Sequence, residues 1–278
     1  MPAPSQLLRR AVKSAAAAAD AVRPPRQGVV ILIYHRVGGA SDLELDLPVG
    51  LFEAQAEALA ASGRVVPLGE ALARLNGPSG RSDDGSGDAP VVLTFDDGTA
   101  DFVDRAVPIL VRYRLPVTLY AATSFIDEAR PFPGDGRPVS WRGLADVCAT
   151  GLVDVGSHTH GHRLLDRLPV DEVADELDRS IDLIAEHTGR PPLDFAYPKA
   201  VAGSSDAERA VRQRFRSAAL AGTRSNPLDA TDPYRLARSP IQHSDGMRWF
   251  ERKLQGGMGM EDGLRRALNR WRYAAATT

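Results

Sequence analysis

The sequence predicts an α/β fold in which a parallel sheet or barrel carries helices on its outside. The first observation is a set of short apolar, β-branched runs, such as Val-Val-Ile-Leu-Ile-Tyr at 29–34, which are typical of strands buried on both faces. The second is that segments with helical spacing alternate with these runs, an order that favours a parallel sheet. The chain has 278 residues, which is enough for one large domain of this kind.

The same patterns place the individual elements along the chain. Strands are expected at 29–34, 91–95, 117–121, 152–155 and 193–197. Helices are expected at 52–61, 102–113, 141–150, 170–187, 205–215 and 263–273. The clearest helix, 170–187, has Gly189 just past its end, where glycine is favoured. The polar Gly/Ser/Asp stretch at 76–90 predicts a surface loop.

Three segments divide the chain: a tail at 1–27, the main domain at 28–255 and a helical tail at 256–278. Basic residues beside an alanine run in the first tail resemble a weak signal peptide. Lys13 and Asp20 bracket too short an apolar core, so we expect no cleaved signal and a cytoplasmic location. A helix that binds a membrane surface or a partner weakly is the alternative. No run approaches the roughly 18 apolar residues of an integral membrane segment.

Composition excludes several classes of protein. Hydrophobic residues make up 43% of the chain and charged residues 25%, as in soluble globular proteins. The net charge of −2 offers no basic field for nucleic acid. A single cysteine, Cys148, excludes a disulfide framework within the chain and a cysteine-based zinc cluster. Oxygen and nitrogen ligands remain available for a metal, and nothing in the composition indicates an oligomeric state.

The first chemical signal is the pair Asp96 and Asp97 in Thr-Phe-Asp-Asp-Gly, directly after the second strand. Ligands bind at the carboxyl ends of strands in α/β folds, and two adjacent like charges are costly there without a cation or hydrogen bonds. A plain turn is the alternative, because Asp-Gly is a common turn pair. The same tripeptide, Asp-Asp-Gly, occurs at 83–85 without a preceding strand, so we interpret that copy as part of an exposed loop.

The second signal is a histidine cluster after the fourth strand. His158, His160 and His162 are half of the six histidines of the chain. Two imidazoles four residues apart can reach one metal ion. Together with the aspartate pair they predict a metal site, and one aspartate with two histidines suits zinc while leaving a position open for water. Two weaker motifs lie at the ends of other predicted strands: Tyr-His-Arg at 34–36 and Phe-Ala-Tyr-Pro-Lys at 195–199.

Together these motifs resemble the polysaccharide deacetylase family, the NodB homology domain of carbohydrate esterase family 4. The blocks 31–37, 94–98, 156–162 and 195–198 occur in the order of that family, and the resemblance runs from about residue 29 to 255. It implies a distorted (β/α)7-type barrel. It also implies a metal-dependent hydrolase that removes N-acetyl groups from an amino-sugar polymer, an oligosaccharide or a precursor.

The resemblance assigns roles to individual residues. Asp96 corresponds to the general base of the family, whereas Asp97, His158 and His162 correspond to its ligands for a divalent metal ion, Zn²⁺ first and other divalent metals as alternatives. His160 falls at a variable position and is not counted as a ligand. Lys199 follows the proline of the last block, so its backbone N–H is expected to face the oxyanion.

The general acid and the partner of the base are less defined. Members that begin with a Tyr-His block supply the acid from the first strand, which favours His35, while His243 sits late in the chain as in the common pattern. Ala196 stands where common members have an arginine that braces the base. Any charge partner of Asp96 must therefore come from elsewhere. Lys199-Ala200 replaces the usual Tyr-Gly, which affects contacts with substrate.

Two other function classes remain as alternatives. His158-Thr159-His160 also fits the His-x-His of amidohydrolases, but there the motif comes first in the chain and here the aspartate pair precedes it. A catalytically inactive carbohydrate-binding module is the non-enzyme alternative, although all candidate catalytic groups are present. The acetylated substrate, and the choice between an N-acetyl and an O-acetyl group, stay open.

Overall fold

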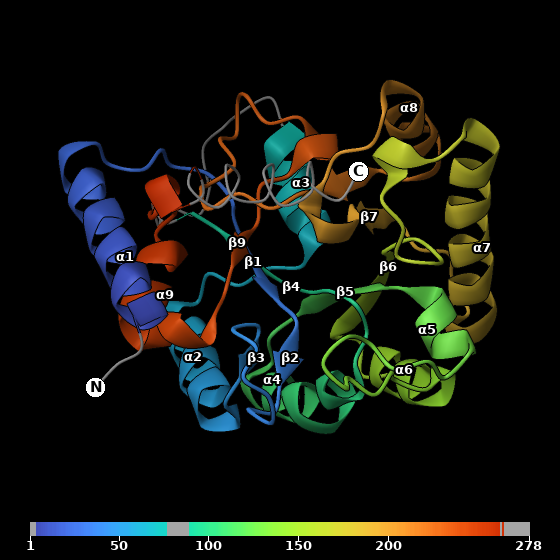
Figure 1. Cartoon of the computed structure of the whole chain (residues 1–278), viewed down its shortest axis with the longest axis horizontal. Helices are drawn as coiled ribbons and strands as arrows, with labels where there is room; N and C mark the ends of the chain where they lie inside the picture. The colour runs from blue at the N-terminus through green and yellow to red at the C-terminus, as the bar shows by residue number, and fades with distance from the viewer. Residues whose placement is uncertain (1–3, 77–88, 262, 264–278) are drawn as a thin grey trace.

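Seven parallel strands form a single curled sheet in the computed structural model, which describes residues 4–76, 89–261 and 263 (Figure 1). The strands lie in the order β8-β7-β6-β5-β4-β1-β9, with helices packed around the sheet. Every pairing between neighbouring strands is parallel. This arrangement confirms the expected α/β fold of the distorted (β/α)7-barrel type.

The five predicted strands are present to within a residue or two of their expected ends. They are β1 (Val30–Tyr34), β4 (Val91–Phe95), β5 (Val117–Ala121), β6 (Val153–Ser157) and β7 (Asp194–Ala196). The last two strands of the sheet, β8 (Ser217–Ala219) and β9 (Ser239–Pro240), were not predicted because they are short and have no apolar run. A separate two-stranded sheet contains β2 (Arg36–Val37) and β3 (Asp46–Leu47).

The predicted helices within the described ranges are also present. They are α2 (Val49–Ser62), α4 (Val107–Tyr113), α6 (Trp141–Cys148), α7 (Val170–Thr188) and α8 (Ser205–Arg214). The segment predicted as one helix at 102–113 begins with a π-type turn, η1 (Phe102–Ala106), before α4. Additional helices are α1 (Pro4–Val22), α3 (Leu68–Asn76), α5 (Thr123–Asp127) and α9 (Gly246–Leu254). The predicted helix at 263–273 and most of the predicted loop at 76–90 lie outside the described residues.

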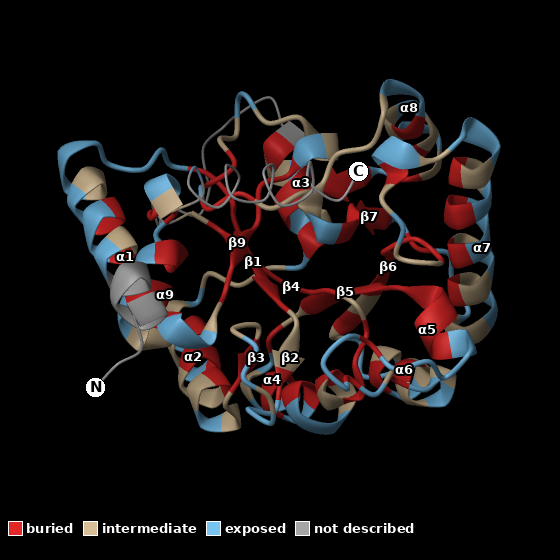
Figure 2. Cartoon of the chain, in the orientation of Figure 1, coloured by how far each residue is buried: buried red, intermediate tan, exposed pale blue. Residues whose placement is uncertain are grey.

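The strands are buried on both faces, as their uninterrupted apolar sequences require (Figure 2). Alternate residues of β1 belong to different clusters of the core: Leu32 packs in the cluster that includes α2 and α4, and Ile31 in the cluster that includes α3. The sheet is thus the rigid centre of the domain, from which the loops at its carboxyl end project. None of the described helices combines the length and apolar character needed to cross a bilayer.

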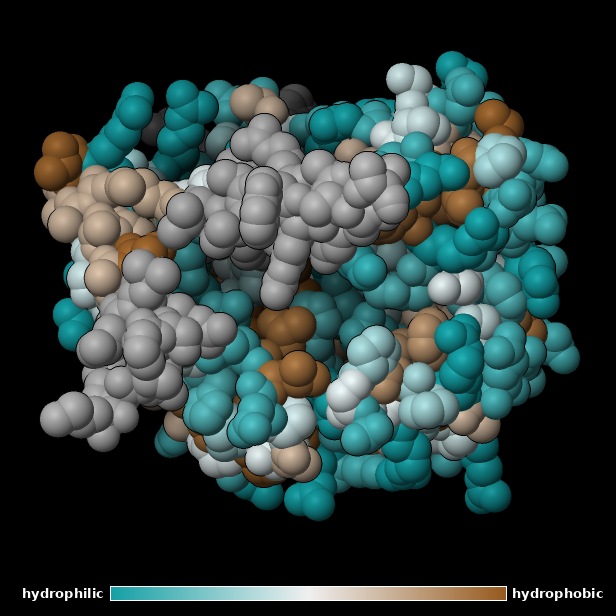
Figure 3. All heavy atoms as spheres, viewed as in Figure 1, coloured by the Kyte–Doolittle hydropathy of each residue, from teal (hydrophilic) through white to brown (hydrophobic). Residues whose placement is uncertain are grey.

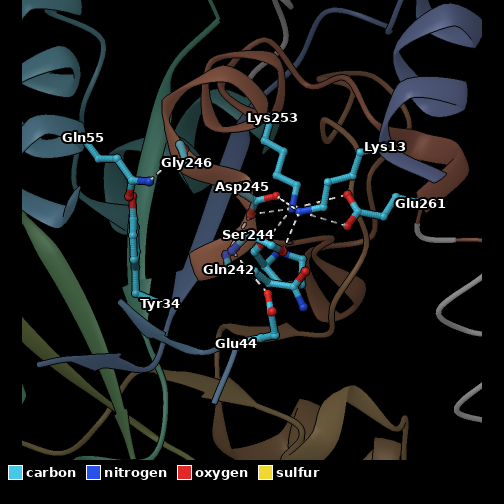
Figure 4. A network of polar contacts seen from close by, with 11 residues as sticks. Lys13, Tyr34, Glu44, Gln55, Gln242, Ser244, Asp245, Gly246, Lys253 and Glu261 are labelled. Atoms are coloured by element: carbon cyan, nitrogen blue, oxygen red, sulfur yellow. Dashed lines mark hydrogen bonds and ion pairs between the residues drawn. The ribbon is translucent and has the colours of Figure 1, made fainter. Parts of the chain in front are cut away.

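The segment 4–22, placed in a tail by the sequence, forms helix α1 and packs on α9. Its alanine run favours helix, and Ala16 contacts Trp249 of α9 in a small apolar cluster. Lys13 is 2% exposed and forms an ion pair with buried Asp245, which Lys253 also contacts at 2.9 Å (Figure 4). Buried charges of opposite sign offset one another here. The division of the chain at residue 28 stays a prediction.

The sheet is nearly closed into a barrel by the segment 236–241. The Leu236 N–H donates to Ala218 O of β8 at 3.0 Å, and the Gly222 N–H donates to Arg238 O at 2.8 Å. A few residues later, β9 pairs with β1 on the other edge, and the Ile241 N–H donates to Ile33 O. One segment therefore bonds to both edges of the open sheet, and Arg238 lies in the middle of it.

Candidate active site

The loop after β4 carries the aspartate pair and is held by backbone hydrogen bonds on both sides. The Asp96 N–H donates to Tyr34 O at 3.0 Å, and Asp97 O accepts from the Ala122 N–H at 3.0 Å. Asp97 has a φ of 74° and Gly98 a φ of 101°, so the chain turns sharply at the end of the strand. Glycine tolerates that conformation at 98, whereas at Asp97 it is unusual for a residue with a Cβ.

The loop after β6 carries the histidines and is fixed from the neighbouring helix α7. The His160 N–H donates to Glu176 O at 3.0 Å, and the Gly161 N–H donates to the Glu176 carboxylate at 2.6 Å. Thr159 and His162 both have positive φ values, of 65° and 56°. Such strained backbone is found where the surrounding structure holds functional groups in place.

These two loops bring Asp97, His158 and His162 together. Their potential ligand atoms all lie within 4.8 Å of one another. His162 Nε2 is 3.5 Å from Asp97 Oδ1, and His158 Nε2 is 3.8 Å from the same oxygen. A carboxylate oxygen and two imidazole nitrogens facing one point are a donor set that fits a divalent ion such as zinc.

The protonation of the two histidines suits metal binding. His158 Nδ1–H donates to Ala196 O at 2.7 Å, which leaves the Nε2 lone pair directed at Asp97. Burial lowers the pKa of His158 to about 4, although Asp96 opposes this, and burial likewise lowers the pKa of His162 to about 4. Both rings are therefore neutral at neutral pH, the form in which imidazole binds a metal.

His160 does not join this cluster. Its Nδ1 lies 2.9 Å from the hydroxyl oxygen of Thr123, and its side chain is buried on the side of α5 and α7. That His160 is not a ligand stays a prediction. Its contribution is to the position of the loop that carries the other two histidines.

Asp96 forms a buried fork-to-fork ion pair with Arg238, a residue that the sequence did not single out. Arg238 Nη1 lies 2.6 Å from Asp96 Oδ1 and Nη2 lies 2.8 Å from Oδ2. Arg238 is 1% exposed and Asp96 5%. The same guanidinium donates to the Thr94 hydroxyl and to Leu220 O, so it is held from three directions.

This contact decides the charge of Asp96. Burial alone would raise the pKa of the carboxyl, but the charge of Arg238, followed by that of His158, holds it at about 2. Asp96 is therefore ionised at neutral pH. The local sequence could not reveal this partner, since Arg238 is 142 residues away and adjoins a strand of two residues. The sequence did indicate that Ala196 occupies the position where common family members have an arginine.

Of the two candidate acids, His35 lies near the aspartates and His243 lies on the surface. His35 directly follows β1, and its charge affects the pKa of both Asp96 and His162. Its Nδ1 is buried and has no hydrogen-bond partner among the described residues. His243 is exposed, and its backbone N–H donates to Glu44 O. Which of the two acts as the acid stays a prediction.

Lys199 lies in the turn after β7, on the side of His162. Its φ is 53°, and its charge contributes to the lowered pKa of His162. The next N–H groups of the turn, at Ala200 and Val201, donate to Tyr197 O and Pro198 O. The expected role of the Lys199 N–H at the oxyanion stays a prediction.

The comparisons with known proteins agree with this fold. Residues 83–218 match the family model for polysaccharide deacetylase. No curated protein sequence matches the chain. Among solved structures, IcaB from Ammonifex degensii is 24% identical, with a TM-score of 0.69 over 82% of this chain and 98% of that one.

Two further solved structures are similar to this chain over nearly their full length. The Streptococcus pyogenes deacetylase PplD, in complex with acetate, is 20% identical with a TM-score of 0.68 over 83% of this chain and 99% of that one. The de-N-acetylase from Aggregatibacter actinomycetemcomitans is 20% identical with a TM-score of 0.64 over 81% and 99%. These likenesses show a shared fold. In sequence, residues 83–218 of the chain are similar to the polysaccharide deacetylase family.

Proposed function

We propose that the protein is a metal-dependent deacetylase that hydrolyses N-acetyl groups of an amino-sugar polymer, oligosaccharide or precursor. The observation that carries this proposal is the position of Asp97, His158 and His162 within 4.8 Å of one another, beside the ionised and anchored Asp96. The similar structures include a deacetylase in complex with acetate and a de-N-acetylase, which supports an acetylated substrate.

The aspartates take different parts in the reaction. Asp97, with His158 and His162, would hold a divalent ion, which when bound polarises the acetyl carbonyl and makes water more acidic. Asp96 keeps both oxygens on Arg238 and lies 4.0 Å from His158 Nε2, so its carboxylate borders the same space. Because it is ionised, it can accept the proton of the attacking water.

The remaining steps use groups at the ends of neighbouring strands. Negative charge develops on the former carbonyl oxygen, and the backbone N–H of Lys199 would donate a hydrogen bond to it. His35, in its protonated form, would donate a proton to the leaving amine. The products are acetate and a free amino sugar. Zinc is the preferred ion because the donor set combines two imidazoles with one carboxylate.

The test is an acetate-release assay on N-acetylglucosamine oligomers with and without a chelator. We expect release that the chelator abolishes and that added Zn²⁺ restores. For aspartate variants of the cluster, the matched control in this assay is Asp146→Asn, because the Asp146 side chain is 72% exposed on α6, away from the cluster. Binding of the oligomers without any release of acetate, at every metal tested, would contradict the proposal and favour an inactive carbohydrate-binding module. Release that a chelator leaves unchanged would contradict the metal dependence.

A further inference from the structure

A cavity of about 610 Å³ lies beside the amino end of β1. Its walls are the connection from α1 to β1, the loop after β8, the turn η4 (Pro233–Arg235) and the residues that follow α9. The Val29 N–H donates to Asn226 O beside it, so the cavity adjoins the residue that precedes β1. His35 and the candidate active site lie beyond the other end of this 5-residue strand, which spans roughly 16 Å.

Arginine is the dominant charged residue of this cavity. Arg23, Arg26 and Arg224 are exposed in its wall and form no ion pair with any residue in the described part of the chain. A fourth arginine, Arg235, is paired with Glu208. The connection that bears the first two is exposed along the upper left edge of the molecule, after α1 (Figure 2).

The acidic residues of the wall do not balance these charges. Asp232 is paired with Arg212 and also accepts the Tyr234 N–H. Asp20 accepts the Met258 N–H at 2.7 Å through Oδ2. Among the described residues, the wall therefore contains one carboxylate without an ion pair, that of Asp20, and three arginines without one. The excess of positive charge is local, since the whole chain has a net charge of −2.

The backbone that carries the arginines is anchored before any ligand binds. The Arg23 N–H donates to Ala19 O at 2.8 Å, and Arg26 O accepts from the Ser225 hydroxyl. Between them, two prolines restrict φ and stiffen the connection. The Arg224 N–H donates to Gly222 O at 2.8 Å. Rigid attachment lowers the conformational entropy that binding must overcome.

We propose that this cavity binds a phosphate ester through Arg23, Arg26 and Arg224. The planar fork of a guanidinium matches two phosphate oxygens, and charge-assisted hydrogen bonds of this kind are about twice as strong as neutral ones. The volume suits a small phosphate ester or a lipid headgroup. Val22, 88% exposed, precedes Arg23, and Met260, 58% exposed, lines the wall. Apolar side chains also gather over the upper end of α1 (Figure 3), as a phosphate carried by a lipid would allow.

The test has two arms that distinguish a soluble phosphate ester from a lipid headgroup. In the first, glycerol 3-phosphate is titrated into the full chain by calorimetry. In the second, the full chain is sedimented with phosphatidylcholine vesicles with and without phosphatidylglycerol. Binding in the first arm assigns a soluble ester. Binding only to vesicles that contain phosphatidylglycerol assigns the lipid headgroup.

Two variants with equal charge change locate the binding. The cavity variant is R23Q/R26Q/R224Q, and the control R114Q/R142Q/R209Q removes three exposed arginines that do not line the cavity. We expect the cavity variant to bind at least roughly tenfold more weakly, because it loses the charge-assisted bonds, and the control to bind like the wild type. Acetate release should be unchanged in both. No binding in either arm, or an equal loss in both variants, would overturn the proposal.

Discussion

Replacing Arg238 by leucine should destabilise the protein strongly, because it leaves the charge of Asp96 buried without a partner. Breaking a buried ion pair from one side typically costs about 3–5 kcal/mol. A second estimate comes from the pKa of Asp96, lowered from 3.8 to about 2, which corresponds to roughly 2 kcal/mol of stabilisation at neutral pH. The folded pKa is below the unfolded one, so this contribution is present above about pH 4 and is lost as the pH falls toward 2.

The assay is a double-mutant cycle on metal-free protein at pH 7. The free energy of unfolding is measured by denaturant for the wild type, Arg238→Leu, Asp96→Asn and the double variant. Chelation removes any contribution of metal binding to stability. We expect the double variant to recover most of the loss caused by Arg238→Leu, because it contains no unpaired buried charge. The resulting coupling free energy should be about 2–3 kcal/mol.

Additivity would refute this reasoning. If the two single losses sum to the loss of the double variant within about 0.5 kcal/mol, the pair does not interact as the contacts imply. Arg238→Lys serves as an internal control. This variant keeps the charge but not the bidentate fork, so its free energy of unfolding should fall between those of the wild type and the leucine variant.

Three further outcomes follow from the structure. Asp245 has a lowered pKa, because the charges of Lys253 and Lys13 outweigh its burial. In denaturant unfolding, the stability advantage of the wild type over Asp245→Asn should therefore shrink below about pH 4, and a difference that stays constant with pH would contradict this. Gly156→Ala should lower the free energy of unfolding by roughly 1–3 kcal/mol, since the new Cβ would lie 2.6 Å from the Tyr120 ring. Gly50→Ala, whose Cβ would meet nothing within 4 Å, should leave it unchanged, and equal losses in the two variants would argue against a steric cause. His35→Gln should reduce the rate of acetate release by about 100-fold or more while His243→Gln leaves it nearly unchanged, and the reverse pattern would assign the acid to His243.

The sheet was largely predictable from the sequence, because its central strands are apolar runs that local pattern identifies. The strand at 29–34 and the strand at 91–95 are buried on both faces, which needs no knowledge of distant contacts. The closing segment was not predictable. β9 is a Ser-Pro pair, and only the longer segment 236–241 that contains it forms hydrogen bonds with both edges of the sheet. Arg238 was missed for the same reason.

Helix α1 shows a similar limit at longer range. A lysine among alanines is usually solvated. Lys13 is instead buried against Asp245, which lies 232 residues further along the chain. No local pattern contains such a pairing. The same ion-pair cluster fixes the turn after β9, because Asp245 accepts the Gln242 N–H. The first helix and the closing strand of the barrel are thereby connected.

The candidate metal cluster was predictable as residues but not as geometry. Spacing and strand ends indicated the aspartate pair and the histidine cluster, and the family resemblance implied Asp97, His158 and His162 as the ligands. These three residues lie together. The backbone that orients them was not visible in the sequence, because positive φ is uncommon even for Asp and His, so residue type alone does not locate it at Asp97 and His162. Glu176, which holds the histidine loop from α7, was missed as well.

The most direct test of the central claim compares Asp96→Asn with Asp97→Asn in metal content and acetate release. If Asp97 holds the ion and Asp96 accepts the proton, Asp96→Asn should retain the ion at wild-type stoichiometry and lose acetate release by about 100-fold or more. Asp97→Asn should lose both the ion and the activity. Full activity in Asp96→Asn, or full metal content in Asp97→Asn, would contradict the division of roles between the two aspartates.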